Sequence, residues 1–192
     1  MRLEDEKMKT FLGTVLVSTI FLVSSGTAYS DDRDGGLAFE ARLSSAQEVP
    51  ENPSEARANI EVEFNKGFTE LKFVLSVRDT TDFITRAHFH CNKPGENGPI
   101  VFGIFDPGPF PVPMNANSLK LEGTLKNSDW TGADCVPTIG RVVNNLASLA
   151  FAMREGLIYA NVHTIFRPGG EVRGQMIEVI DDDKDHKFDN RR

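Results

Sequence analysis

Two histidines one residue apart are the clearest candidates for chemistry in this chain. His88 and His90 lie in the stretch RAHFHCNKPGENG, where Cys91 directly follows them. Alternate residues of a β-strand lie on one face, about 7 Å apart at a rise of about 3.3 Å per residue, so both imidazoles can reach one ion. His163, in LIYANVHTI, could supply a third nitrogen from a neighbouring strand. An open site of three histidines suits copper or zinc.

Strand alternation places these histidines opposite the apolar face. Ala87 and Phe89 alternate with His88 and His90 in the sequence. In the last predicted hairpin, matching polar to polar residues pairs His163 with Arg173 and leaves residues 167–169 as the loop. Two interpretations remain open: the histidines bind a metal, or they hydrogen-bond neighbouring loops. The metal interpretation requires that the three imidazoles come within about 4 Å of a common point.

The elements that must position these residues are mostly strands. Alternating apolar and polar residues predict eight of them, and the proline-rich segment 106–113 is predicted to be a loop or an edge. The strands cover residues 37–43, 58–64, 70–77, 83–90, 100–105, 118–125, 157–165 and 171–179. Apolar residues at three- and four-residue spacing over 139–153 predict one helix. The fold class is therefore mainly β, an antiparallel, Greek-key-like β-sandwich of about eight strands with one amphipathic helix.

Composition limits the size and the partners of the protein. The chain has 192 residues, 40% of them hydrophobic, and a net charge of -7. This length supports one well-buried domain, and the acidic balance argues against a nucleic-acid partner.

The N-terminal sequence is typical of an export signal. From Met8, which we interpret as the true start, one lysine precedes a short apolar run and then small residues. A run this short fits a cleaved signal peptide over residues 1–30, although a retained membrane anchor is the alternative. A polar leader at 31–36, a domain at 37–179 and a charged, disordered tail at 180–192 follow, and His186 in the tail is given no role. We expect a secreted, periplasmic or cell-surface protein without a stable membrane span after cleavage.

Export also affects the two cysteines. Outside the cytosol, Cys91 and Cys135 are expected to form a disulfide that closes a loop of 44 residues. A free Cys91 that serves as a soft metal ligand is the alternative.

Three segments resemble the CHRD (chordin-type) domain: LSSAQEVPENPSEARA, AHFHCNKPGENGPIV and GLIYANVHTIFRPGGEVRGQM. The resemblance covers about residues 39–179. It implies an extracytoplasmic β-sandwich, found alone in microbial secreted proteins, to which no biochemical activity is firmly attached. Besides the three histidines, the polar residues that match its pattern are Gln47, Glu48, Asn97, Tyr159, Asn161, Glu171, Arg173 and Gln175.

These observations lead to competing functional hypotheses. The first is a non-catalytic domain that binds an extracellular protein or a cell-envelope component. The alternative is a copper or zinc protein that uses His88, His90 and His163, an arrangement similar to that of copper-zinc superoxide dismutase. Outside the tail the chain has no fourth histidine to bridge two metals, which argues against dismutase activity. A weaker third hypothesis is a hydrolase in which Glu171 is the general base and Arg173 binds an anion.

Overall fold

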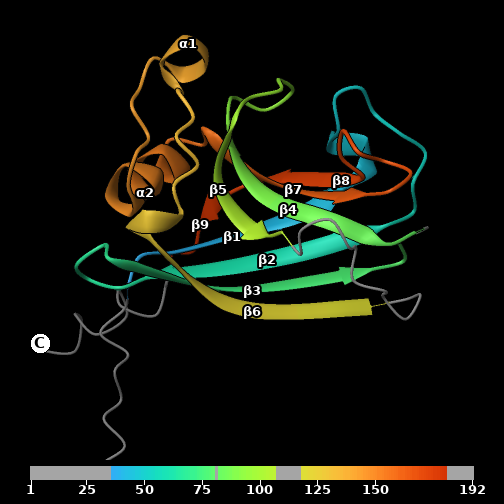
Figure 1. Ribbon diagram of the computed structural model, residues 1–192, viewed down its shortest axis with the longest axis horizontal. Helices are drawn as coiled ribbons and strands as arrows, with labels where there is room; N and C mark the ends of the chain where they lie inside the picture. The colour runs from blue at the N-terminus through green and yellow to red at the C-terminus, as the bar shows by residue number, and fades with distance from the viewer. Residues whose placement is uncertain (1–35, 81, 107–117, 181–192) are drawn as a thin grey trace, which may run out of the picture. The chain divides into compact units, whose positions relative to one another are not determined.

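The computed structural model describes residues 36–80, 82–106 and 118–180. This part of the chain forms one antiparallel sheet in the spatial order β5-β4-β7-β8-β1-β2-β3-β6, with β9 paired to β1 (Figure 1). The strands are β1 (Ala38–Ser44), β2 (Arg57–Phe64), β3 (Glu70–Arg78), β4 (Ile84–Cys91), β5 (Ile100–Phe105), β6 (Ser118–Lys126), β7 (Ile158–Thr164), β8 (Val172–Gln175) and β9 (Ile177–Glu178). A bridge between Phe102 and Trp130 joins β5 to the segment after β6, so the sheet is nearly closed.

The predicted fold class is confirmed. A strand lies at each of the eight predicted positions, and the last of them is divided in two. Met176 donates its backbone N–H to Ile158 of β7 at 2.9 Å, and β9 then pairs with β1. The chain therefore separates from β7 after Met176 but stays beside β1, which pairs with both β8 and β9, and alternation alone does not reveal this.

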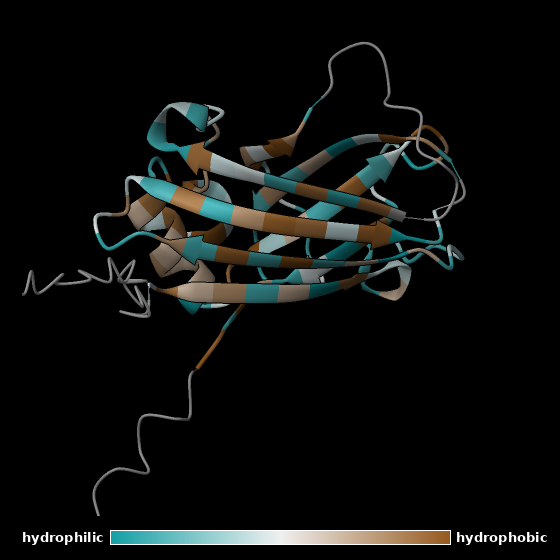
Figure 2. Ribbon diagram, turned by 90° about the horizontal axis from the view of Figure 1, so that it is seen from below, coloured by the Kyte–Doolittle hydropathy of each residue, from teal (hydrophilic) through white to brown (hydrophobic). Residues whose placement is uncertain are grey.

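The core lies on one face of the sheet. In β1 and β2, buried and exposed residues alternate, so that Phe39, Ile60 and Phe64 are buried while Glu40 and Glu61 face solvent. Figure 2 shows the same alternation of apolar and polar residues along the strands. Residues with period-two hydrophobicity can bury one face only by forming strands, because successive side chains point to opposite sides.

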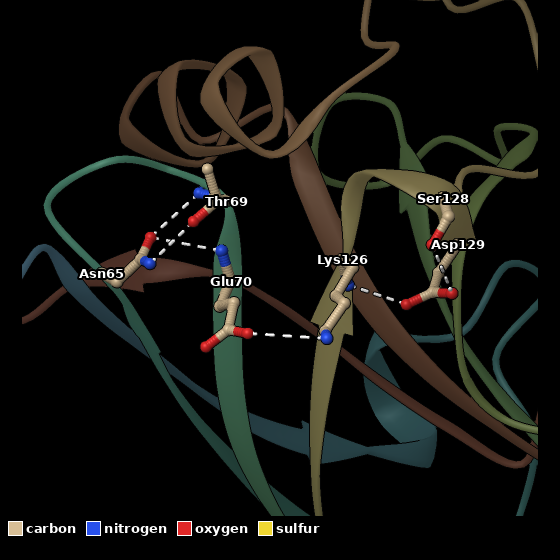
Figure 3. Close-up of polar contacts among 6 residues, drawn as sticks. All are labelled: Asn65, Thr69, Glu70, Lys126, Ser128 and Asp129. Carbon is tan, nitrogen blue, oxygen red and sulfur yellow. Dashed lines mark hydrogen bonds and ion pairs between the residues drawn. The ribbon is translucent and has the colours of Figure 1, made fainter.

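The β2–β3 connection, residues 65–69, is held by side chains that bond to the backbone. Asn65 accepts N–H groups from Thr69 at 2.9 Å and from Glu70 at 3.2 Å, and it donates to the Thr69 hydroxyl at 2.8 Å (Figure 3). Lys126 lies opposite Glu70 on β6, with its Nζ 3.6 Å from the carboxylate. This exposed ion pair is worth at most about 1 kcal/mol, so the asparagine bonds and the apolar face hold the hairpin.

The prediction of a single helix over residues 139–153 is wrong for the first half of this range. The structure contains α1 (Val136–Ile139) and α2 (Leu146–Arg154) instead. Gly140 ends α1 in the left-handed region at φ 68°, and Asn145 caps α2 by accepting the Ser148 N–H at 2.8 Å. These two local signals outweigh the apolar spacing between them. α2 packs against β7 and β9 at one end of the sheet (Figure 1).

The predicted disulfide between Cys91 and Cys135 is confirmed. The two Cα atoms are 6.0 Å apart, and both side chains are fully buried. The bond ties the end of β4 to the residue before α1, so Cys91 is not a free thiol ligand.

Several predictions concern residues outside the described part of the chain. The signal peptide at 1–30, most of the polar leader, the proline-rich residues 107–113 and the tail from 181 onward belong to this group. No helix of the described residues combines the length and the hydrophobicity needed to cross a membrane.

Candidate metal centre

The three candidate histidines come from two adjacent strands, β4 and β7. Across this pair, the core-facing couples are Ala87 with Val162 and Phe89 with Ala160. The couples on the opposite face contain the histidines: Arg86 with His163, His88 with Asn161 and His90 with Tyr159. The prediction that the three histidines lie on the face opposite the apolar core is confirmed.

The histidines are nevertheless buried. His88 is 5% exposed, and His90 and His163 are each 7% exposed. All seven residues of β7 are buried, because loops cover the face that alternation assigns to the surface. The histidine cluster, His88, His90 and His163, therefore lies in a polar layer between the sheet and these loops.

The predicted pairing of His163 with Arg173 is wrong. Arg173 pairs with Asn161, and the β7–β8 ladder ends at Val162 and Val172. The connection is longer than predicted because Thr164 and Arg167 form their own turn through reciprocal backbone hydrogen bonds of 3.3 Å. A register shift of two residues keeps every side chain on the same face, so matching polar to polar residues could not detect it.

The three rings converge. Their centroids are 5.1 Å apart for His88 and His163, 5.7 Å for His88 and His90, and 5.9 Å for His90 and His163. One ring nitrogen of each histidine lies within 4.8 Å of the other two. Three nitrogens at these separations each lie within about 2.8 Å of a common centre. A zinc–imidazole bond is about 2.0–2.1 Å long. The cluster meets the geometric requirement that the sequence set, and side-chain shifts of under about 1 Å would bring the nitrogens to bonding distance.

Backbone carbonyls determine which ring nitrogens carry hydrogen. His90 Nδ1 lies 2.9 Å from the Gly98 carbonyl oxygen, and His163 Nδ1 lies 3.0 Å from that of Pro168. A carbonyl can only accept, so Nδ1 is the donor in both rings and Nε2 keeps its lone pair. Within the described residues, His90 Nε2, His163 Nε2 and His88 Nδ1 are buried without a hydrogen-bond partner. Metal-binding histidines are usually held in this way, with one nitrogen on a carbonyl and the other free.

The histidines are neutral at ordinary pH. Burial, assisted by the nearby histidines and by Arg86, lowers the pKa of His88 to about 3. Burial lowers the pKa of His90 to about 4, against the opposing effect of its bond to Gly98. Burial also lowers the pKa of His163. All three rings therefore hold the form that binds metals.

The other motif residues attach loops over this centre. We call Gln47, Glu48, Asn97, Tyr159, Asn161, Glu171, Arg173 and Gln175 the loop-anchoring cluster. Arg173 is its hub: the buried guanidinium donates to the Gln47 carbonyl, to Asn97 Oδ1 at 2.9 Å and to the Glu96 carbonyl at 3.3 Å. It also lies 4.8 Å from the centre of the Tyr159 ring. One side chain of β8 thus holds both the β1–β2 and the β4–β5 connections.

The β4–β5 loop is anchored twice beside His90. The Gly98 N–H donates to the Tyr159 hydroxyl at 3.1 Å, while the Gly98 carbonyl accepts from His90. The Tyr159 ring stacks on His90 at 4.9 Å with 10° between the planes. A side chain at position 98 would overlap the Cys91 carbonyl, so the loop can lie this close only with glycine there. Gln175 completes the attachment by donating to the Asn92 carbonyl at 3.0 Å.

The two acidic members of the cluster, Glu171 and Glu48, are buried beside β7 and the β7–β8 connection. Glu171 is fully buried and accepts the Ser54 hydroxyl at 2.6 Å. Asn52 donates to the carbonyls of Gly170 and Glu171 at 3.3 and 3.2 Å, so the β1–β2 and β7–β8 connections lie side by side (Figure 1). Glu48 accepts from Asn161 at 3.5 Å, and burial raises its pKa to about 7 despite the charge of Arg173.

These contacts assign Glu171 and Arg173 to loop attachment, which leaves the hydrolase hypothesis without support from their geometry. Sequence reasoning missed Ser54 and Asn52, and it missed the carbonyls of Gly98 and Pro168 that orient the rings. Backbone carbonyls carry no side-chain signal, so only the positions of the loops could have revealed them.

Comparison with known families agrees with the motifs. A family model described as the CHRD domain matches residues 39–176, which is most of the chain. Neither the curated proteins nor the solved structures gave a significant match.

Proposed function

The chain belongs to the CHRD domain family, and on this premise we propose that it is an exported, non-catalytic domain whose histidine cluster binds one copper or zinc ion. The observation that carries the proposal is the set of three buried ring nitrogens without hydrogen-bond partners, His88 Nδ1, His90 Nε2 and His163 Nε2. Leaving such an atom unsatisfied costs about 1–3 kcal/mol, and one ion would satisfy all three.

The donor set fits such an ion. Imidazole nitrogen suits both copper and zinc, and three histidines leave a fourth position for water or another ligand. The carbonyls of Gly98 and Pro168 would fix the orientation of two ligands, and the loop-anchoring cluster would keep those carbonyls in place. On this proposal, the histidine cluster provides the metal ligands, and the loop-anchoring cluster holds those ligands in position.

Export is supported by the same structure. A disulfide persists mainly in oxidising compartments, and the Cys91–Cys135 bond is one. Together with the signal-like N-terminus, the disulfide favours a secreted, periplasmic or cell-surface protein. A copper or zinc site in such a protein would be in contact with metal ions outside the cytosol.

Titration of the metal-free full chain with copper and with zinc tests the proposal. We expect one equivalent to bind, and a His88→Ala, His90→Ala, His163→Ala variant to bind at least about 100-fold more weakly. Loss of a residue that only supports a ligand weakens metal binding by about 10- to 100-fold, and loss of the ligands themselves should cost more. His186→Ala is the matched control, since it removes the remaining histidine and should leave binding unchanged.

Circular dichroism must show that the triple variant is folded, and His163→Gln offers a milder change if it is not. If the parent, the triple alanine variant and His163→Gln all bind the metal with equal affinity, the metal site is refuted.

Binding to a cell-envelope component is a second candidate function. Three large apolar side chains, Phe83, Ile165 and Phe166, are exposed, and the Ile165 N–H donates to the Phe83 carbonyl at 3.2 Å. We call these three residues the apolar patch. Exposed apolar groups that lie together often mark interaction sites.

Cosedimentation with isolated cell envelopes tests this candidate. An Ile165→Ser, Phe166→Ser variant should lose at least about tenfold in bound fraction if the apolar patch makes the contact, since hot-spot side chains contribute about 2 kcal/mol or more. Phe151→Ser, which changes an exposed phenylalanine on α2, is the control. Unchanged sedimentation of the patch variant would exclude this surface.

A further inference from the structure

The histidine cluster provides no negative charge to a bound ion. Its three imidazoles are neutral, and the group of ligand atoms found among the described residues contains neither a carboxylate nor a thiolate. Cys91, next to His90, is bound in the disulfide. A metal ion held here would therefore keep its full charge in a layer where the ligands are 5–7% exposed.

Cationic side chains lie around the cluster. Arg86 pairs with His163 across β4 and β7, and its Nε is 3.9 Å from Asp106 Oδ2, so this acid offsets part of its charge. Arg173 is buried, and its guanidinium lies over the Tyr159 ring that stacks on His90. The positive charge of Arg173 is thus held close to the cluster, and the Glu48 carboxyl, which is near enough for this charge to lower its pKa, offsets part of it because burial raises that pKa to about 7.

Both features penalise a divalent ion more than a monovalent one. Repulsion by fixed positive charges doubles when the charge of the ion doubles, and the Born cost of burial rises with the square of the charge. Three neutral nitrogens also satisfy Cu⁺, which is stable with three ligands, whereas Zn²⁺ in a three-histidine site takes a further ligand such as water. The small exposure of the rings restricts such a ligand.

We infer that the histidine cluster selects Cu⁺ over Zn²⁺. This inference rests on the proposed metal-binding function and adds the ion and its oxidation state. The selecting elements are the neutral donor set, the burial of the ligands and the two arginines beside it.

The test compares affinities for the two ions on the metal-free full chain. Cu⁺ is titrated without oxygen against bicinchoninate, with ascorbate present to keep the copper reduced, and Zn²⁺ is titrated against a chromogenic zinc chelator. We expect the dissociation constant for Cu⁺ to be at least about 10³-fold lower than that for Zn²⁺, because burial and the nearby positive charges both act more strongly against a divalent ion. Zinc affinity equal to or above that for Cu⁺ would overturn the selectivity while leaving the metal site intact. Failure of both ions to bind would refute the site itself.

An arginine variant tests the electrostatic origin of the selectivity. Arg86→Gln should improve Zn²⁺ binding more than Cu⁺ binding and so reduce the affinity ratio by about threefold, the effect of one exposed charge. Arg141→Gln is the matched control, because Arg141 is similarly exposed and also pairs with one carboxylate, that of Glu155. An unchanged ratio in Arg86→Gln would overturn the role of this charge in selection.

Discussion

Removal of the Cys91–Cys135 disulfide is expected to lower the free energy of unfolding by about 4 kcal/mol. The bond joins residues 44 positions apart, so in the reduced unfolded chain a long loop regains its conformational freedom. Both cysteines are fully buried, and the bond holds the end of β4, next to His90, to the segment before α1.

Denaturant unfolding of the oxidised protein and of a Cys91→Ala, Cys135→Ala variant measures this effect. The alanine pair also leaves a small cavity, so the parent protein under a non-metal-binding phosphine reductant is the control that keeps both sulfur atoms. A loss below about 1 kcal/mol in the reduced parent would contradict the expected constraint on the unfolded chain.

Acidification should destabilise the metal-free protein by on the order of 2 kcal/mol between about pH 7 and pH 5. Burial lowers the pKa of His88 to about 3 and of His90 to about 4, and it lowers that of His163 as well. The unfolded chain protonates these rings near pH 6.5, while the folded chain does not. The unfolded state therefore binds more protons than the folded state below about pH 6.5. The free energy of unfolding decreases as the pH is lowered, until the pH reaches the pKa values of the folded state.

Glu48 acts in the opposite direction. Burial raises its pKa to about 7, so between about pH 4.5 and pH 7 the folded state binds the extra proton and acid favours folding. A Glu48→Gln variant should thus lose more stability on acidification than the parent, and a triple His→Gln variant of the histidine cluster should lose less. Urea unfolding across this range measures both slopes. A Glu48→Gln profile that is flat or rises toward pH 5 would show that the histidines are not held neutral by the fold, because this variant lacks the opposing carboxyl.

Most of the fold could be predicted because the strands are half-buried. The sequence of β2 alternates apolar and charged residues, and Ile60, Val62 and Phe64 are buried as this pattern requires. The helix prediction was wrong where two local signals, Gly140 and Asn145, interrupt an apolar pattern. The break between β8 and β9 could not be predicted, because it depends on where the chain separates from the neighbouring strand β7.

The candidate site could be predicted only in part. Alternation placed His88, His90 and His163 on one face, and their convergence follows from the pairing of β4 with β7. Their burial does not follow from it, because it comes from loops joined through Arg173, Asn97 and Tyr159. A polar residue on the outer face of a strand gives no sign that a loop from elsewhere in the chain covers it.

The structure of the protein loaded with copper tests the central claim most directly. We predict one anomalous scattering peak bonded to His88 Nδ1, His90 Nε2 and His163 Nε2 at about 2.0–2.1 Å, with the bonds from His90 to Gly98 and from His163 to Pro168 retained. Copper bound elsewhere, or a histidine cluster without a peak at saturating metal, would contradict the account and leave these residues to hold the loops alone.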